Sequence, residues 1–392
     1  MNVNVGNNRA LRFVLLLGAV SLFGDMTYEA ARSIIGPYLA LLGASAAAVG
    51  VVAGLGEFIG YGFRVVSGLV SDRTHRYWTI TIAGYVISLA AVPALALTGN
   101  WPAAAVLMMA ERFGKAVRNP ARDAMLSHAA HEMGRGWAFG IHEAMDQVGA
   151  IIGPAIVAGV LAWKGSYAYG FGVLLIPALI ALAVLVAARV IYPHPRSLEP
   201  SFDVSKAGGF RPVFWLYLAS IAFIALGFAD FPLAAFHIKT AGVIADEWIP
   251  LLYAGAMGVD ALSALVLGRL YDTKGMTVLF VAVSATALSA PLVFLSGAGL
   301  LAAGMALWGI GMGAQESIIR AVVADITPAD RRATAYGLFN AGFGFAWFAG
   351  SSVMGVLYGK TVTGMVAFSV LAQLASLPLL FLVRRRLAGE NG

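Results

Sequence analysis

Long apolar stretches are the feature that most constrains this chain. Twelve of them follow one another along the 392 residues, and a helix needs about 20 residues to cross a bilayer. We therefore expect an all-α integral membrane protein with twelve transmembrane helices. The stretches cover residues 11–42, 46–68, 79–99, 102–124, 137–162, 167–190, 212–238, 246–270, 277–297, 299–321, 334–357 and 361–383.

The composition supports a bilayer as the chain's main partner. Hydrophobic residues make up 60% of the chain and charged residues 12%, whereas soluble domains contain about 45–50% and about 25%. The formal net charge of +6 does not indicate nucleic-acid binding, because the basic residues are spread between apolar stretches. Cysteine is absent, which excludes disulfides and thiolate metal sites. The first apolar stretch is too long and too charged for a cleavable signal peptide.

A charged motif occurs twice, between apolar stretches, with an offset of 200 residues. Each copy has the form Gly-x-x-x-Asp followed by basic residues, and we expect each to form a turn. A pattern that repeats after half a chain predicts two similar halves. The positions concerned are Gly68, Asp72, Arg73 and Arg76 in the first copy, and Gly268 and Asp272 in the second.

The segment 192–211 separates the two sets of six stretches. It contains prolines, glycines and charged residues, a composition typical of loops. We predict an N-terminal six-helix bundle over residues 1–191, a cytoplasmic linker over 192–211 and a C-terminal six-helix bundle over 212–392. A disordered insertion without an architectural role is the alternative for the linker.

The duplicated motif resembles the loop signature between helices 2 and 3 of the major facilitator superfamily, with its echo between helices 8 and 9. His75 stands at the second glycine of that signature, and Tyr77 at one of its basic positions. The resemblance implies two pseudo-symmetric bundles that rock around a site near the middle of the membrane. It also implies that the duplicated motif acts as a conformational gate.

The distribution of basic residues predicts the orientation, because cytoplasmic loops are enriched in Lys and Arg. Loops on one side contain only Lys164, Lys239 and Lys360. We therefore expect both termini in the cytoplasm and the protein in the cytoplasmic (plasma) membrane, the inner membrane of the cell. The basic residues on the cytoplasmic side are Arg73, Arg76, Arg135, Arg196, Lys206, Lys274, Arg331, Arg332, Arg384, Arg385 and Arg386.

Ionisable residues inside the apolar stretches are candidates for a site. A charge inside a bilayer is costly and is tolerated where it faces water or a partner. Stretches 3, 6, 9 and 12 have no such residue in their interiors, so we expect them to face lipid while the others surround a polar interior. The candidate substrate- or ion-binding residues are Asp25, Tyr28, Glu29, Arg32, Glu57, Arg112, Lys115, His142, Glu143, Asp146, Asp230 and Glu316.

The first stretch carries Asp25, Glu29 and Arg32 at positions i, i+4 and i+7, with Tyr28 beside them. This spacing places them on one helix face. The face is either part of a site or an ion-pair ladder that holds helix 1 to its neighbours. Gly36-Pro37 predicts a kink or the end of the helix on the outer side.

The fourth stretch contains Arg112 at the place of the arginine in the family's helix-4 motif, with Lys115 where that motif has a glutamine. Arg118 and Arg122 follow toward the predicted cytoplasmic mouth. We expect these two arginines to anchor the helix at the lipid headgroups.

The fifth stretch contains Gly149, Gly153 and Pro154, which resemble the helix-5 Gly-x-x-x-Gly-Pro motif of antiporters. The same glycine spacing is also an ordinary device for close helix packing. His142 and Asp146, at i and i+4, precede the motif on the same helix.

An ion gradient is the expected energy source. The chain has no nucleotide-binding motif and no nucleophile elbow, so we expect neither a cofactor nor an enzyme. A carboxyl group in a low-dielectric cavity suits reversible protonation. Asp146 is the first choice for the proton carrier and Asp25 the second. The alternative for Asp146 is a permanent ion pair with Lys115 or Arg112.

These observations favour a secondary active transporter that exports a small organic solute in exchange for protons and acts as a monomer. The alternative is uptake of an organic anion or small metabolite by proton symport, favoured by Arg32, Arg112 and Lys115. Metal-ion transport is a further alternative, suggested by His142 with His128 and His131 ahead of it. The last alternative is a membrane scaffold or membrane enzyme.

Overall fold

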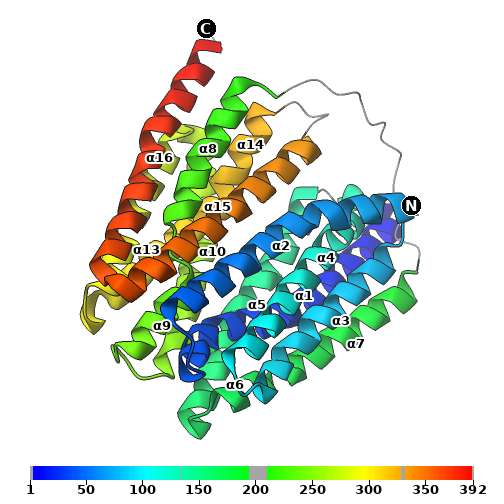
Figure 1. The fold of residues 1–392 in the computed structure, drawn as a ribbon. Coiled ribbons are helices and arrows are strands. Elements are labelled where there is room, and N and C mark those ends of the chain that lie inside the picture. Colours follow the sequence, from blue (N-terminus) through cyan, green and yellow to red (C-terminus); the bar gives the residue numbers. More distant parts are fainter. Residues whose placement is uncertain (1–2, 134, 194–209, 328–331, 391–392) are drawn as a thin grey trace. The chain divides into compact units, whose positions relative to one another are not determined.

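The computed structural model describes residues 3–133, 135–193, 210–327 and 332–390. The regular structure of these residues is entirely helical (Figure 1), which confirms the predicted all-α class. Eleven of the helical segments described are long and apolar enough to cross a membrane. The remaining predicted stretch, the fourth, forms α4, Trp101–Met133. Its 33 residues are long enough to span a bilayer, at 1.5 Å per residue, but they carry too many charges to qualify by hydropathy.

The helices fall into two groups along the chain. The first comprises α1 (Val3–Leu41), α2 (Ala46–Thr74), α3 (Tyr77–Ala94), α4 (Trp101–Met133), α5 (Arg135–Lys164), α6 (Tyr167–Val173) and α7 (Leu175–Ile191). The second comprises α8 (Pro212–Gly227), α9 (Phe231–Thr240), α10 (Trp248–Lys274), α11 (Thr277–Thr286), α12 (Ser289–Phe294), α13 (Ala298–Ala314), α14 (Arg320–Ile326), α15 (Arg332–Lys360) and α16 (Val362–Glu390).

Contacts divide the chain into two compact units. Unit 1 contains residues 1–34 and 63–203, and unit 2 contains residues 35–62 and 204–392. Helices α1 and α2 therefore each contribute one end to each unit. The predicted division at residues 191 and 212 follows the sequence repeat, not the contacts, and it remains a prediction. Most of the predicted linker, residues 194–209, lies outside the described residues.

Unit 1 is built on close packing of α3 against α4 and α7 (Figure 1). A Cβ atom added to Gly84 or Gly114 would lie 2.7 or 2.6 Å from the backbone carbonyl oxygen of the other, so these glycines allow α3 and α4 to approach. At the end of the core, the Trp78 indole Nε1 donates to the Tyr192 carbonyl oxygen at 2.9 Å. A buried indole N–H usually finds such an acceptor.

Unit 2 is held together by the same kinds of contact, close packing at glycine and an indole hydrogen bond, between different helices. Helix α8 packs against α15 and α16, and α10 packs against α13. On α13, a Cβ added to Gly313 would lie 2.7 Å from the Asp260 carbonyl oxygen, so a small residue is needed there. The Trp308 indole Nε1 donates to the Ala229 carbonyl oxygen at 2.9 Å.

Three of the predicted stretches are broken helices. The breaks lie between α6 and α7, between α8 and α9, and between α11 and α12, shortly before Pro177, Pro232 and Pro291. Proline has no N–H to donate to the carbonyl four residues earlier. At the second break, the carbonyl oxygen of Gly227, the last residue of α8, accepts hydrogen bonds from Ser369 and Gln373 at 2.6 and 3.1 Å.

Two local predictions are corrected by the structure. Helix α1 passes through Pro37 and ends at Leu41, so Gly36-Pro37 does not end it. The predicted turn from Gly68 to Arg76 is wrong in extent, because α2 continues to Thr74. The turn is confined to the end of the motif, where His75 has a φ of 57°.

The second copy of the motif behaves in the same way. Gly268 and Asp272 lie inside α10, which ends at Lys274. Gly275, 200 residues after His75, has the same φ of 57°. The motif is therefore a helix end followed by one residue of positive φ in both copies. The Asp72 side chain lies outside the described residues.

Candidate functional site

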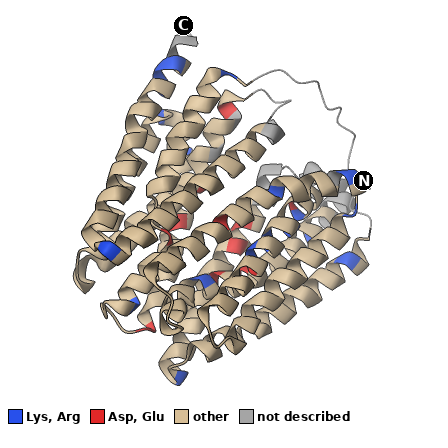
Figure 2. Ribbon diagram, viewed as in Figure 1, with Lys and Arg blue, Asp and Glu red and all other residues tan. Residues whose placement is uncertain are grey.

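Helix α1 supplies the first part of the candidate site in unit 1. Asp25, Tyr28, Glu29 and Arg32 are all buried, with exposed fractions of 6, 8, 8 and 8%. Acidic residues lie well inside the lengths of several helices, as Figure 2 shows. Since ionisable groups are rarely buried without a partner, the neighbours of these four side chains decide what the site can do.

Lys115 of α4 lies between two of these side chains. Its Nζ atom lies 3.6 Å from the centre of the Tyr28 ring and 4.0 Å from Oε1 of Glu29. The ammonium group thus receives both an aromatic face and a carboxylate, two interactions that strengthen when water is excluded.

Asp25 is the centre of the charges in this region. The charged groups that act on its carboxyl group are Asp146, Lys115, Glu29 and Arg118. Helix α5 can approach Asp25 closely because Gly149 has no side chain. A Cβ added to Gly149 would lie only 3.1 Å from Cβ of Asp25. Two acids from α1 and one from α5 therefore share the cations of α4.

Asp146 has one of its partners on its own helix, α5. Its Oδ2 atom lies 3.4 Å from Nδ1 of His142, one turn earlier on α5. Of the alternative partners that the sequence suggested, Lys115 lies near Glu29, and Nε of Arg112 lies 3.3 Å from Oε2 of Glu111. Ser21 of α1 and Arg122 of α4 also act on the Asp146 carboxyl group, so its neighbours come from three helices.

The arginines further along α4 were predicted to anchor at lipid headgroups, and for Arg118 this is wrong. Arg118 is 1% exposed, and its guanidinium carbon lies 4.0 Å from the centre of the Tyr85 ring. Its Nε and Nη1 atoms have no hydrogen-bond partner. Arg122 is also directed inward, since its Nη1 atom donates to the Ser21 hydroxyl at 2.9 Å.

We call Asp25, Tyr28, Glu29, Lys115, His142 and Asp146 the charged site. All six were predicted site residues, and α1, α4 and α5 bring them together in unit 1. Tyr85 and Ser21 were not predicted to lie near this site, and Arg118 was predicted at the lipid headgroups. Periodicity alone gave a signal for Arg118, because it lies one turn after Lys115 on the same helix face.

Other predicted site residues lie elsewhere. Glu143 is exposed on α5, next to buried His142. Glu57, Asp230 and Glu316 belong to unit 2. Asp230 has a structural role as the N-cap of α9, where its Oδ1 atom accepts from the Phe231 N–H at 2.8 Å. Such a cap satisfies one of the free donors at the start of a helix.

The helix-5 glycines are packing residues in this structure. A Cβ added to Gly149 would collide with the Leu22 carbonyl oxygen, and one added to Gly153 with Cα of Met26 at 2.8 Å. Pro154 follows inside α5 without ending it. The glycines therefore hold α5 against the part of α1 that carries Asp25.

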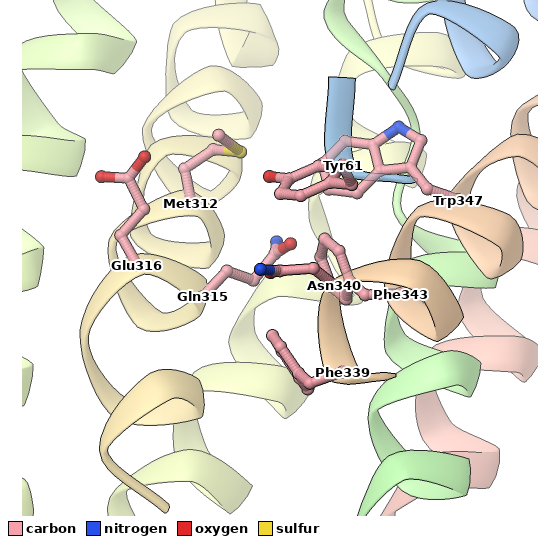
Figure 3. A pocket seen from close by; sticks show the side chains of 8 residues that line it. All are labelled: Tyr61, Met312, Gln315, Glu316, Phe339, Asn340, Phe343 and Trp347. Carbon is pink, nitrogen blue, oxygen red and sulfur yellow. The ribbon is translucent and has the colours of Figure 1, made fainter. Parts of the chain in front are cut away.

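Glu316 lines a separate hollow in unit 2 (Figure 3). The space between its side chains is about 20 Å³, room for about one water molecule. Apart from Glu316, none of its lining residues was a predicted site residue. Helix-period spacing was the available signal, because Phe339, Phe343 and Trp347 follow one another at i, i+4 and i+8. We call it the aromatic hollow; its lining residues are Tyr61, Met312, Gln315, Glu316, Phe339, Asn340, Phe343 and Trp347.

Metal binding receives no support from the part of the chain that the structure describes. No group of three or more His, Asp or Glu side chains there could hold a metal ion. The side chains of His128 and His131, which suggested metal transport, lie outside the described residues.

Known sequences resemble this chain over nearly its whole length. The family model for the Major Facilitator Superfamily matches residues 15–351 and 248–391. An uncharacterized protein of Mycobacterium tuberculosis is 44% identical over 382 residues, which are 96% of this chain and 93% of that protein. An uncharacterized MFS-type transporter of Methanocaldococcus jannaschii is 28% identical over 399 residues, 97% of each chain.

Solved structures share the fold. A bacterial homolog of the human lysosomal transporter Spinster, inward-facing and occupied, matches with a TM-score of 0.75 and 15% identity, covering 95% of this chain and 96% of its own. The nucleoside transporter NupG matches with a TM-score of 0.73 and 14% identity, covering 95% and 99%. At such identities the likeness concerns the fold alone.

Proposed function

The chain belongs to the Major Facilitator Superfamily, and on that premise we propose that it exports a small organic solute in exchange for protons. It is an integral membrane protein of the secondary-transporter type. Transporters of this kind work by alternating access around a site between helices. Export, proton coupling, action as a monomer and the absence of enzymatic activity belong to the proposal.

The observation that carries the proposal is the buried charged site. Asp25 is 6% exposed and is acted on by Asp146 and Glu29 as well as by Lys115. Like charges that are desolvated together disfavour full ionisation, so a proton can be taken up or released when the balance of neighbours changes. Alternating access changes that balance twice in each cycle. We therefore assign proton coupling to Asp25 and Asp146.

A reconstituted exchange assay tests this proposal. Purified full-length protein is first screened by thermal shift against organic cations, anions and neutral metabolites, and the strongest stabiliser becomes the transport probe. In proteoliposomes a pH gradient should drive the probe against its own gradient, in the direction opposite to the protons. Transport that is insensitive to the pH gradient would contradict the proposal.

Uptake of an organic anion by proton symport is the second candidate. It is favoured by the buried guanidinium of Arg118, whose Nε and Nη1 atoms lack hydrogen-bond partners. In the same proteoliposomes, symport would move the probe in the same direction as the protons. The sign of the flux relative to the pH gradient thus separates the two candidates.

The proposal includes an orientation with both termini in the cytoplasm of a cell whose plasma membrane holds the protein. Lys164 and Lys360 end α5 and α15, at the side with few basic residues. Reporter fusions at these two positions should be active outside the cytoplasm. A cytoplasmic signal at either position would contradict the orientation.

We also propose that the duplicated motif gates transport. Gly68, Asp72, Arg73 and Arg76 lie at or just after the end of α2, and Gly268 and Asp272 lie near the end of α10. Charges at helix ends can form different contacts in different states. Asp72→Asn should slow transport and alter cross-linking between helix ends while expression stays normal. Unchanged turnover and unchanged cross-linking would show that the motif does not gate transport and only helps to fix the orientation of the helices in the membrane.

A further inference from the structure

One end of unit 2 carries a group of exposed basic side chains. Arg384, Arg385 and Arg386 follow one another in the last part of α16, and all three are exposed. Arg211, the residue before α8, is exposed as well. Basic residues thus lie at the end of α16 and at the start of α8, on the same side of unit 2 (Figure 2). We call these four residues the arginine patch.

The packing of α8 against α16 brings the four arginines to one level. The two helices pack against each other in opposite directions (Figure 1). Where α8 ends, a Cβ added to Gly227 would lie 2.5 Å from the Ser369 carbonyl oxygen. Sixteen residues separate Gly227 from Arg211, and sixteen residues after Ser369 the chain reaches Arg385. Since both helices rise by about 1.5 Å per residue, Arg211 and Arg385 lie at the same height.

The length of α16 places the patch at the surface of a bilayer. The hydrocarbon core is about 30 Å thick and corresponds to about 20 helical residues. The apolar stretch 361–383 has this length, contains no charged residue and is followed directly by the three arginines. Its side chains Leu371 and Phe381 are 67 and 56% exposed, as expected for a face in contact with lipid. The arginines therefore lie where the hydrocarbon ends and the phosphate groups of the lipids begin.

An exposed indole marks the same depth on α8. Trp215 lies one turn after Arg211 and is 50% exposed. Its ring meets the Phe214 ring edge-on, with centroids 5.5 Å apart. Tryptophan is enriched at the boundary between hydrocarbon and headgroups. The exposed ring on α8 and the change from apolar to basic residues on α16 thus place this end of unit 2 at the headgroups independently of each other.

The charge along these two helices has one sign. Helix α8 contains no acidic residue, and α16 contains none before Glu390. Guanidinium groups bind phosphate through two parallel hydrogen bonds, and clustered basic residues just outside a membrane helix are typical of binding to anionic lipids. A zwitterionic headgroup carries a cation beside its phosphate, which the arginines repel. The patch therefore favours an anionic phospholipid over a zwitterionic one.

We propose that the arginine patch binds the phosphate groups of anionic phospholipids in the leaflet at this end of unit 2. Lipids held there contact both α8 and α16 and stabilise the packing of the two helices. The patch is separate from the charged site. Its role does not depend on the proposed direction or coupling of transport.

Quenching of Trp215 fluorescence tests which lipid collects at the patch. Full-length protein is reconstituted into nanodiscs of phosphatidylcholine and phosphatidylglycerol in equal amounts, in which one lipid or the other carries bromine in its acyl chains and quenches nearby indoles. The contribution of Trp215 is the difference between the native protein and Trp215→Phe. Brominated phosphatidylglycerol should quench this contribution at least about twofold more strongly than brominated phosphatidylcholine. Equal quenching by the two lipids would overturn the proposal.

Combined substitutions locate the preference. The triple variant Arg384→Gln, Arg385→Gln and Arg386→Gln should lose most of the preference for phosphatidylglycerol, whereas lysine at the same three positions should retain most of it, because the charge remains. The matched control is Lys164→Gln with Lys360→Gln, two exposed cations at the ends of α5 and α15, and it should behave as the native protein does. A preference that survives in the glutamine variant, or an equal loss in the control, would overturn the assignment.

Thermal unfolding separates a bound lipid from soluble phosphate. The native protein should unfold at a higher temperature in nanodiscs that contain phosphatidylglycerol than in phosphatidylcholine alone, and the glutamine variant should lose most of this shift. Inorganic phosphate added to phosphatidylcholine nanodiscs should not reproduce the shift, because the proposed ligand is part of the membrane. A shift of equal size with inorganic phosphate, or a full shift in the glutamine variant, would overturn the proposal.

Discussion

The charged site of unit 1 and the aromatic hollow of unit 2 differ in their polar groups. Unit 1 buries acids and bases together, as Asp25, Glu29 and Arg118 show with exposed fractions of 6, 8 and 1%. The hollow of unit 2 is lined by four rings, two amides and one acid. Acids are buried in unit 2 as well, outside the hollow, as Asp230 and Asp260 show. The two sites therefore differ in chemistry although both units bury acids.

This difference favours the charged site for the proposed proton coupling. Ionisable groups that act on one another are suited to take up and release protons, whereas rings and amides do not change their own charge. The packing devices are common to both units, since glycines against carbonyl groups and indole donors to carbonyl groups occur in each. The scaffold is repeated, and the functions that we propose for it are not.

The strongest way to break the comparison is to remove charge from one unit at a time. Asp25→Asn and Asp146→Asn should reduce gradient-driven transport to the level of empty liposomes, because the carrier can no longer exchange a proton. Both variants should still bind the probe and exchange it across the membrane. Glu316→Gln, which removes the acid of the aromatic hollow in unit 2, should instead retain coupling to the pH gradient. Fluxes in proteoliposomes measure both effects.

The control for this test is Glu247→Gln, an acid outside both sites that should behave as the native protein does. Asp146→Asn that still concentrates the probe under a pH gradient would rule out Asp146 as the coupling residue. A loss of exchange together with coupling would instead mark Asp146 as a structural partner, whose removal strands a buried positive charge.

Alanine substitutions on α5 test whether its glycines are needed for close packing against α1. Gly153→Ala should destabilise the protein by about 1–3 kcal/mol, because the added carbon would overlap the backbone of α1 and force α1 and α5 apart. Gly159, two turns further along the same helix, has nothing within 4 Å of an added Cβ. Gly159→Ala should be neutral or stabilising by up to about 1 kcal/mol. Thermal unfolding in one detergent compares the pair.

The residues of the charged site were predicted from the sequence with unequal success. The helix period placed Asp25, Glu29 and Lys115 correctly in one region, because ionisable residues in apolar helices must face each other or water. Arg118 was misjudged because α4 was expected to end near residue 124 and instead continues to Met133. Arg118 therefore lies deep inside the helix and not at its end.

The aromatic hollow could not be assembled from the sequence in the same way. Tyr61 and Trp347 are separated by most of the chain, and nothing local indicates that they meet. The π-helical turn of residues Gln315–Ile319, between α13 and α14, has no sequence signature of its own, since it depends on how the neighbouring helices pack. The residues that line the hollow and the π-helical turn therefore depend on tertiary packing, which helix periodicity does not predict.

A third test compares the indole hydrogen bonds of the two units. Trp78→Phe and Trp308→Phe each retain a ring but leave a buried carbonyl oxygen, of Tyr192 or Ala229, without its donor. Each should cost about 1–2 kcal/mol of stability, measured as a shift of the unfolding midpoint. A shift for Trp308 and none for Trp78 would show that the two units do not depend equally on this device.

The smallest expected effect concerns the two residues of positive φ that follow the duplicated motif. His75 and Gly275 both have a φ of 57°, and a positive φ costs a residue with a Cβ about 1 kcal/mol or more relative to glycine. At Gly275 the ψ of −148° places the backbone in a region that few residues other than glycine adopt. His75→Gly should therefore stabilise the protein by up to about 1 kcal/mol. His75→Asn is the matched control, because asparagine tolerates this conformation better than most residues and keeps a polar side chain. If His75→Gly instead lowers the unfolding midpoint while His75→Asn does not, the side chain at position 75 makes a contact that outweighs the strain, and the two copies of the turn are not equivalent.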